Sequence, residues 1–267
     1  MKYIKQLNQD GYCIIKNIIS KKECDFIKKK LEITHHKYSK LYIQNKGKLN
    51  DNSSEKIVYN LHNKHKKFID IASNLKILNI LDKSFSKGSY EIENNYVLRQ
   101  LSARSPIKGS KDQQLHNDSR FIGSINPLLI VAQVAIDNFK EDNGPIRVVP
   151  KSHKINSFPK QNYKYPNEKN ILLQKGDCLL FNGSLWHGGS KNKTDDTRWA
   201  LLFTYARWFY KPAFDFNLNT TKNIFNKLSK KQKYLLGFNT NPPLDEFTRI
   251  TSKKTEPDRP HKFYLLP

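Results

Sequence analysis

The pattern of apolar residues changes about a third of the way along the chain, and this change limits the fold more than any other feature. Before it, apolar residues recur at helical spacing, which predicts a helical part over about 1–85. Ser20 and Glu23 form a capping-box pattern that predicts a helix start. A polar stretch at 44–56 predicts a loop, and a second helix is expected at about 66–82. The apolar stripe of this second helix comprises Phe68, Ile71, Ala72, Leu75, Leu78 and Leu81.

The rest of the chain consists of short segments rich in branched and aromatic residues, separated by turn sequences such as 142–145 and 175–177. Helices followed by many closely spaced strands predict an α+β fold with a mainly β core, built as a sandwich or barrel. A polar stretch at 155–170 predicts a long insertion over one mouth of that core. The expected strands lie at 128–137, 146–150, 171–181 and 198–206.

The chain has 267 residues and shows no internal repeat or low-complexity linker, so we expect a single domain. In this interpretation a strand-rich core spans about 90–210, and a C-terminal extension follows at 211–267. No apolar run reaches the ~20 residues of a membrane helix, and no apolar stretch follows the first residues. We therefore expect a cytoplasmic protein with no membrane partner. The 3 cysteines form no CxxC pair, which excludes a disulfide framework and a cysteine-based zinc site.

The formal net charge of +23 raises the hypothesis of a nucleic-acid partner. Only 8 of the 47 basic residues are arginines, and the lysines are scattered along the chain among asparagines. Nucleic-acid surfaces usually use arginine and concentrate their charge on one element. The pattern favours a solvated lysine-rich surface, so we expect no nucleic-acid partner.

His116 and Asp118 stand two residues apart just before the strand-rich part, so on an extended backbone both side chains point the same way. A third metal ligand could be His153 or His187. Two histidines and one carboxylate with open positions suit non-haem ferrous iron, although this pattern also fits catalytic zinc. Taken one at a time, each of these residues is better explained as a polar group satisfied in a turn.

Five segments together resemble the phytanoyl-CoA dioxygenase family of iron- and 2-oxoglutarate-dependent oxygenases. They follow in order from about residue 10 to 208, and they read GYCIIKNIISKKEC, LHND, DNGPIRVVPKSHK, KGDCLLFNGSLWHGGS and RWALLFTYA. The resemblance implies a double-stranded β-helix, that is, a jelly-roll or cupin-like barrel, with the N-terminal helices packed outside. It also implies Fe(II) as the metal, with 2-oxoglutarate and O2 as cosubstrates.

The family's metal triad carries over onto His116, Asp118 and His187, and its cosubstrate-binding arginine onto Arg198. A guanidinium can grip the distal carboxylate of 2-oxoglutarate with two parallel hydrogen bonds. His153 lies in a family segment whose histidine is usually structural. The remaining residues that the resemblance implies for cosubstrate binding are Gly189, Ser190 and Gln133. Gly189 stands where some relatives carry a hydroxyl residue, and Ser190 could compensate for its absence.

The resemblance implies hydroxylation of an unactivated C–H bond of a small molecule, with release of succinate and carbon dioxide. Asp118 argues for oxygen transfer, because related halogenases carry a small residue in its place. The basic charge favours an anionic substrate, and 44–56 and 155–170 are candidates for a lid. Candidate substrate residues, each equally well explained as core or surface, are Tyr59, Arg104, Arg120, Phe121, Trp186 and Arg207.

Two other functions remain open at this point. A catalytically silent barrel could bind a ligand or partner with no turnover, but the metal ligands and Arg198 are all present. A nucleic-acid demethylase would share the cofactor chemistry and would use the basic charge, although no nucleotide-recognition element is evident. The sequence does not predict the oligomeric state.

Overall fold

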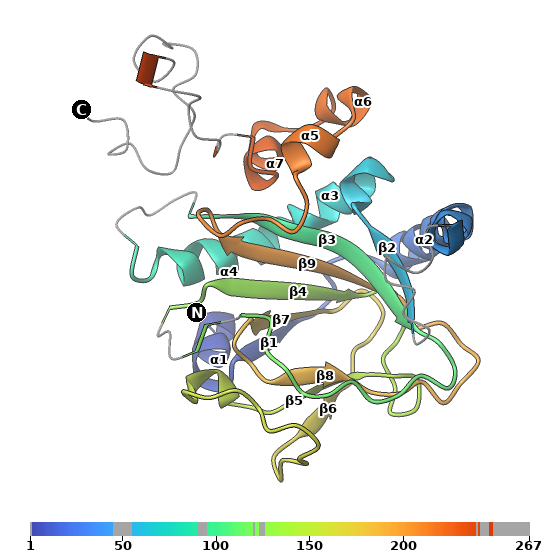
Figure 1. Ribbon diagram of the computed structural model, residues 1–267, viewed down its shortest axis with the longest axis vertical. Coiled ribbons are helices and arrows are strands. Elements are labelled where there is room, and N and C mark those ends of the chain that lie inside the picture. The colour runs from blue at the N-terminus through green and yellow to red at the C-terminus, as the bar shows by residue number, and fades with distance from the viewer. Residues whose placement is uncertain are drawn as a thin grey trace.

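Two antiparallel β-sheets form the centre of the molecule (Figure 1). The computed structural model describes residues 2–44, 55–89, 95–119, 121–122, 126–238, 240 and 246–247. The strands are β1 Tyr12–Ile15, β2 Glu55–Tyr59, β3 Tyr96–Pro106, β4 Leu129–Ala135, β5 Ile146–Val148, β6 Lys169–Ile171, β7 Cys178–Asn182, β8 His187–Gly189 and β9 Ala200–Arg207. The large sheet has the order β1-β7-β4-β9-β3-β2, and the small sheet has the order β6-β5-β8.

Helices cover one side of the large sheet, and the small sheet lies on its other side (Figure 1). The α-helices are α1 Lys2–Asp10, α2 Lys21–Gln44, α3 Lys66–Ala72, α4 Leu75–Ser86, α5 Phe216–Asn219, α6 Lys222–Phe225 and α7 Lys230–Leu235. Two short 3-10 helices are η1 Leu61–Asn63 and η2 Ser152–Lys154. The predicted α+β class with a jelly-roll arrangement is confirmed, although strand pairing among the described residues does not close the sheets into a barrel.

Side chains of the large sheet alternate between two cores. In β4, Ile130, Ala132 and Val134 pack against the helices, whereas Val131 and Ala135 face the small sheet. This alternation follows from the two-residue repeat of a strand. Because both faces of the central strands are covered, these strands read as almost continuous apolar runs.

The structure corrects the predicted helix at 66–82, which is two helices, α3 and α4. Asn74 has an extended backbone between them, and its side chain accepts a hydrogen bond from the Lys76 N–H at 2.9 Å. The Asn74 amide therefore starts a new helix inside the apolar stripe. The capping box at the start of α2 is confirmed, because the Ser20 N–H donates to Glu23 and the Glu23 N–H donates to the Ser20 hydroxyl.

The strands differ from the predicted bounds at two places. The part predicted to be helical also contains β1 and β2, which pair with β7 and β3 at the ends of the large sheet. The segment expected at 171–181 is divided between β6 and β7, and the turn predicted at 175–177 lies between them at Gly176. Gly176 has a φ of 93°, and a Cβ there would lie 2.4 Å from the Ile19 carbonyl oxygen, so the turn requires glycine.

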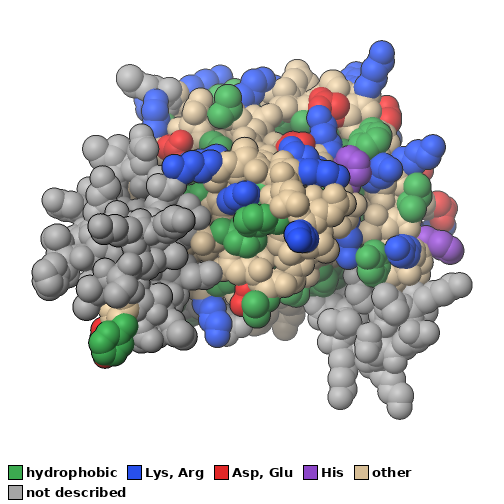
Figure 2. Space-filling model, turned by 90° about the horizontal axis from the view of Figure 1, so that it is seen from above, with side chains coloured by type: hydrophobic (Ala, Val, Ile, Leu, Met, Phe, Trp, Pro, Cys, Tyr) green, Lys and Arg blue, Asp and Glu red, His purple; other side chains and the backbone are tan. Residues whose placement is uncertain are grey.

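Of the two segments proposed as lids, most of 44–56 lies outside the described residues. The segment 155–170 is mostly irregular and ends in β6. Within the described part of the chain, no helix is both long and apolar enough to cross a membrane. On the face seen in Figure 2, lysine and arginine side chains are spread among apolar, acidic and other polar groups.

Candidate active site

His116, Asp118 and His187 form a cluster with the composition of a metal site. One ligand atom from each residue lies within 4.8 Å of the others. Nε2 of His116 is 3.8 Å from one Asp118 carboxylate oxygen, and Nε2 of His187 is 3.7 Å from the other. Two imidazoles and one carboxylate converging on one point provide donors that suit a divalent iron.

Backbone pairing brings these residues together across the sequence. His187 begins β8, and His116 lies opposite it in an isolated antiparallel bridge. The N–H of each histidine donates to the carbonyl oxygen of the other at 2.9 Å. Directly opposed residues of an antiparallel pair present their side chains on the same face. The two imidazoles are therefore neighbours, with ring centroids 4.4 Å apart.

Both imidazoles are oriented by carbonyl oxygens of their own chain segments. Nδ1 of His116 lies 3.1 Å from the Gln114 carbonyl, and Nδ1 of His187 lies 2.9 Å from the Leu185 carbonyl. A carbonyl oxygen only accepts hydrogen bonds, so Nδ1 carries the proton and Nε2 presents a lone pair toward Asp118. Burial lowers the pKa of His187 and outweighs the opposing effect of Asp118, which favours the neutral form that binds cations.

Arg198 is a buried cation with unused hydrogen-bonding capacity. It is 5% exposed, and its Nε and Nη1 atoms have no hydrogen-bond partner among the described residues. Its guanidinium lies over the Phe139 ring at 4.4 Å, and the backbone N–H of Arg198 donates to the Ser105 hydroxyl. Burial lowers the pKa of Arg198 to about 10, so it stays protonated at neutral pH. An unpaired buried charge is costly, and this arrangement suits a ligand carboxylate.

Gln133 and Gly189 lie on the inner surfaces of the two sheets. Gln133 lies between Val131 and Ala135 on the same face of β4, and its buried Oε1 atom has no partner among the described residues. Gly189 pairs with Ile146, whose side chain belongs to the core between the sheets. Their roles in cosubstrate binding stay predictions.

Ser190 lies on the opposite, outer surface of the small sheet. Its hydroxyl donates to the Asn170 side chain at 3.2 Å, and Asn170 pairs with Arg147 on the surface that faces away from the large sheet. This contact does not bring Ser190 to Arg198, and its predicted compensation for Gly189 remains untested.

The predicted substrate residues that the structure describes have different surroundings. Tyr59 packs its ring 5.4 Å from that of Phe214, and Arg104 donates to Glu55 at 2.8 Å. Phe121 is 61% exposed, and Arg120 lies outside the described residues.

Trp186 and Arg207 make contacts typical of structural residues. Trp186 is buried in a cluster with Leu115 and Val149. Arg207 donates to three backbone carbonyls, including that of Phe85 at the end of α4. As substrate residues both stay predictions.

His153 is not part of the metal-type cluster found among the described residues. Its Nε2 atom lies 3.2 Å from the Asn8 carbonyl of α1, which fits the structural role expected for it. Sequence reasoning missed Gln114, whose carbonyl orients His116. No sequence signal identifies this contact, because any residue at that position supplies a carbonyl.

The comparison with protein families decides the identity. The sequence model of phytanoyl-CoA dioxygenase (PhyH) matches residues 7–200. The chain belongs to the phytanoyl-CoA dioxygenase family. As a member of this family it is an iron(II)- and 2-oxoglutarate-dependent dioxygenase.

Two relatives illustrate the range of similarity. Dioxygenase olcK of Penicillium canescens is 26% identical over 246 residues, which cover 88% of this chain and 79% of olcK. Dioxygenase FUM3 of Gibberella moniliformis is 32% identical over 144 residues, which cover 51% of this chain and 47% of FUM3. This second match therefore spans about half of each protein.

Solved structures share the fold. HygX from Streptomyces hygroscopicus, with nickel, 2-oxoglutarate and hygromycin B bound, superposes with a TM-score of 0.63 at 16% identity, covering 79% of this chain and 88% of HygX. The 2-oxoglutarate-dependent epimerase SnoN from nogalamycin biosynthesis has a TM-score of 0.57 at 16% identity, covering 79% of this chain and 82% of SnoN.

Proposed function

We propose that this dioxygenase hydroxylates an unactivated C–H bond of a small molecule, with release of succinate and carbon dioxide. The observation that carries the proposal is the convergence of His116, Asp118 and His187 within 4.8 Å. Three protein ligands leave coordination positions of a metal open for a cosubstrate and dioxygen. The carboxylate at Asp118 supports oxygen transfer over halogenation, which would need that position free.

His116, Asp118 and His187 would hold the iron. Bound iron supplies the activation of dioxygen that organic side chains cannot provide. The chain's own residues set the geometry for this chemistry, because the carbonyls of Gln114 and Leu185 fix both imidazoles with Nε2 toward Asp118.

Arg198 would hold the distal carboxylate of 2-oxoglutarate. Its Nε and Nη1 atoms are buried and have no protein partner among the described residues, so a carboxylate there would satisfy an otherwise costly cation. Gln133 would supply a second polar contact from the inner surface of β4. The apolar core between the sheets, including Phe139 and Phe181, would exclude water from this end of the site.

A small organic substrate is supported by HygX, whose structure contains hygromycin B beside 2-oxoglutarate. The net charge of +23 favours an anionic substrate through long-range attraction. Arg104 on β3, whose guanidinium donates to Glu55, would recognise a polar group of the substrate.

The test is succinate formation from 2-oxoglutarate with ferrous iron, in the presence of a panel of small carboxylic acids, phosphorylated compounds and amino acids. We expect one class to stimulate succinate formation and to gain one oxygen atom by mass spectrometry. Asp118→Ala should abolish this turnover, whereas the matched control His153→Ala should retain it with the fold intact. Full turnover by Asp118→Ala would contradict the assignment of the metal ligands.

A further inference from the structure

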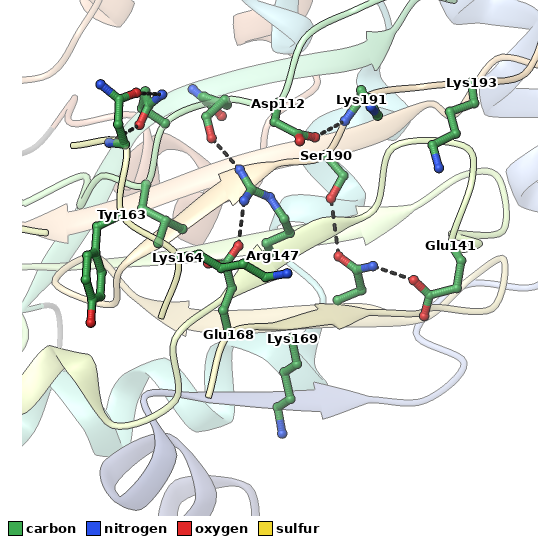
Figure 3. A pocket seen from close by; sticks show the side chains of 15 residues that line it. Asp112, Glu141, Arg147, Tyr163, Lys164, Glu168, Lys169, Ser190, Lys191 and Lys193 are labelled. Atoms are coloured by element: carbon green, nitrogen blue, oxygen red, sulfur yellow. Dashed lines mark hydrogen bonds and ion pairs between the residues drawn. The ribbon is translucent and has the colours of Figure 1, made fainter. Parts of the chain in front are cut away.

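Arg147 lies behind the metal-type cluster, on the outer surface of the small sheet. Its neighbours in β5, Ile146 and Val148, face the core between the sheets, so the Arg147 side chain points the other way. There it contributes to a pocket of about 520 Å³ together with Gln113, Asn162 and Glu168 (Figure 3).

The guanidinium of Arg147 joins two separate segments of the chain. Its Nη1 donates to Glu168 at 2.5 Å, and the Glu168 side chain is only 9% exposed. Its Nη2 donates to the Gln113 carbonyl oxygen, 34 residues earlier in the chain. Only arginine presents two N–H groups in a rigid fork that can reach both acceptors at once.

The Gln113 carbonyl belongs to the segment that carries His116. The Gln113 N–H donates to the Gly189 carbonyl at 2.8 Å, and the Gln113 side chain accepts from the Gly189 N–H at 3.1 Å. The next residue, Gln114, supplies the carbonyl that orients Nδ1 of His116. A displacement of Gln113 would therefore move the carbonyl that fixes the first metal-ligating imidazole.

Two further features support this role for the segment. A Cβ at Gly188 would lie 2.8 Å from the Gln113 carbonyl oxygen, so the bare backbone there permits the close approach. The side chain of Gln114 exchanges two hydrogen bonds with Asn162, at 2.8 and 2.9 Å. The stretch 162–168 is thus linked to the segment that leads to His116 at both ends, directly through Asn162 and through Arg147 from Glu168.

We propose that Arg147, anchored by Glu168, is a positioning residue that holds the segment 113–116 against β8 and thereby raises the affinity of the metal site. The inference rests on the proposed assignment of His116, Asp118 and His187 as metal ligands. It assigns Arg147 no contact with substrate or cosubstrate. Partners that orient ligating histidines typically change metal affinity by about 10–100-fold.

The experiment measures equilibrium binding of Fe(II) to the full chain under anaerobic conditions, together with thermal unfolding of the metal-free protein. We expect Arg147→Gln to weaken Fe(II) binding at least about tenfold, with 2-oxoglutarate affinity unchanged once metal is saturating. Glu168→Gln should weaken it less, because the guanidinium can still donate to Gln113. Lys164→Gln is the matched control, since it removes a charge from the same pocket and should bind Fe(II) as the unaltered protein does.

A merely structural role would lower the unfolding temperature of Arg147→Gln while leaving Fe(II) affinity unchanged, and this result would overturn the inference. If Arg147→Gln does not fold, Glu168→Gln and Arg147→Lys replace it, and unchanged affinity in both would overturn the inference in the same way. Failure of the unaltered protein to bind Fe(II) would overturn the proposed metal site itself, and the positioning role with it.

Discussion

The two faces of the large sheet differ in how they treat buried polar groups. On the helix-covered face, Leu180, Phe203 and Tyr205 are fully buried, and the Tyr205 hydroxyl donates to the Ala72 carbonyl at 2.6 Å. On the inner face, Arg198 and Gln133 are buried with polar atoms that have no partner among the described residues.

Unpaired buried polar atoms destabilise a fold, so a buried guanidinium and a buried amide without partners on the inner face of the sheet call for a separate explanation. On the helix-covered face, the buried Tyr205 hydroxyl finds its acceptor within the protein. On the inner face, the proposed cosubstrate would supply the partners that Arg198 and Gln133 lack among the described residues. Among these buried groups, Arg198 is the one whose positive charge a ligand carboxylate would match.

The largest expected effect on stability comes from the helix-covered face. Phe203→Ala removes a fully buried ring and should lower the free energy of unfolding by about 3–5 kcal/mol. The folded fraction should keep its 2-oxoglutarate requirement, since this side chain faces the helices. Denaturant unfolding and cosubstrate titration measure the two effects. A changed requirement with little loss of stability would contradict the division between the faces.

A second test concerns His62, which is fully buried among the helices that cover the large sheet. Its Nε2 atom is hydrogen-bonded to the Asn219 side chain. Burial lowers the pKa of His62 to about 4, below the ordinary 6.5. Between these values the unfolded chain binds more protons, so stability should fall as pH drops from 6.5 toward 4, by about 3 kcal/mol in all. His62→Gln should flatten this part of the stability profile, and an identical profile in the two proteins would show that His62 does not contribute.

On the inner face, loss of a buried polar group should weaken cosubstrate binding without lowering the stability of the fold. Arg198→Met replaces a buried cation by an apolar chain of similar length, so the free energy of unfolding should be unchanged or higher. The 2-oxoglutarate requirement should rise at least about tenfold, equivalent to about 1.4 kcal/mol. Initial rates of succinate formation and thermal unfolding provide the two readouts. Lower stability with an unchanged requirement would mean that Arg198 serves packing alone.

The features that the sequence predicted are those with local signals. The capping box of Ser20 and Glu23 and the apolar strand near Leu129–Ala135 depend on neighbouring residues, and both are confirmed. The strands β1 and β2 are only four and five residues long and take their partners from distant parts of the chain. Local pattern therefore could not identify them.

The site residues also differ in whether a local sequence signal indicates them. The spacing of His116 and Asp118 is visible in the sequence, whereas His187 and Arg198 were assigned through resemblance to a family. The bridge that places His187 opposite His116 is a long-range backbone contact. The contact of Arg147 with the Gln113 carbonyl spans 34 residues and uses a backbone acceptor. Because every residue type has a backbone carbonyl, the sequence at position 113 does not predict this contact.

The most direct test of the central claim is an anaerobic titration of the metal-free protein with ferrous iron and 2-oxoglutarate, followed by visible absorption. The account predicts a metal-to-ligand charge-transfer band that saturates at one iron and one 2-oxoglutarate per chain and is lost in His187→Ala. A folded protein that gives no band, or a band that persists unchanged in His187→Ala, would contradict the assignment of this site.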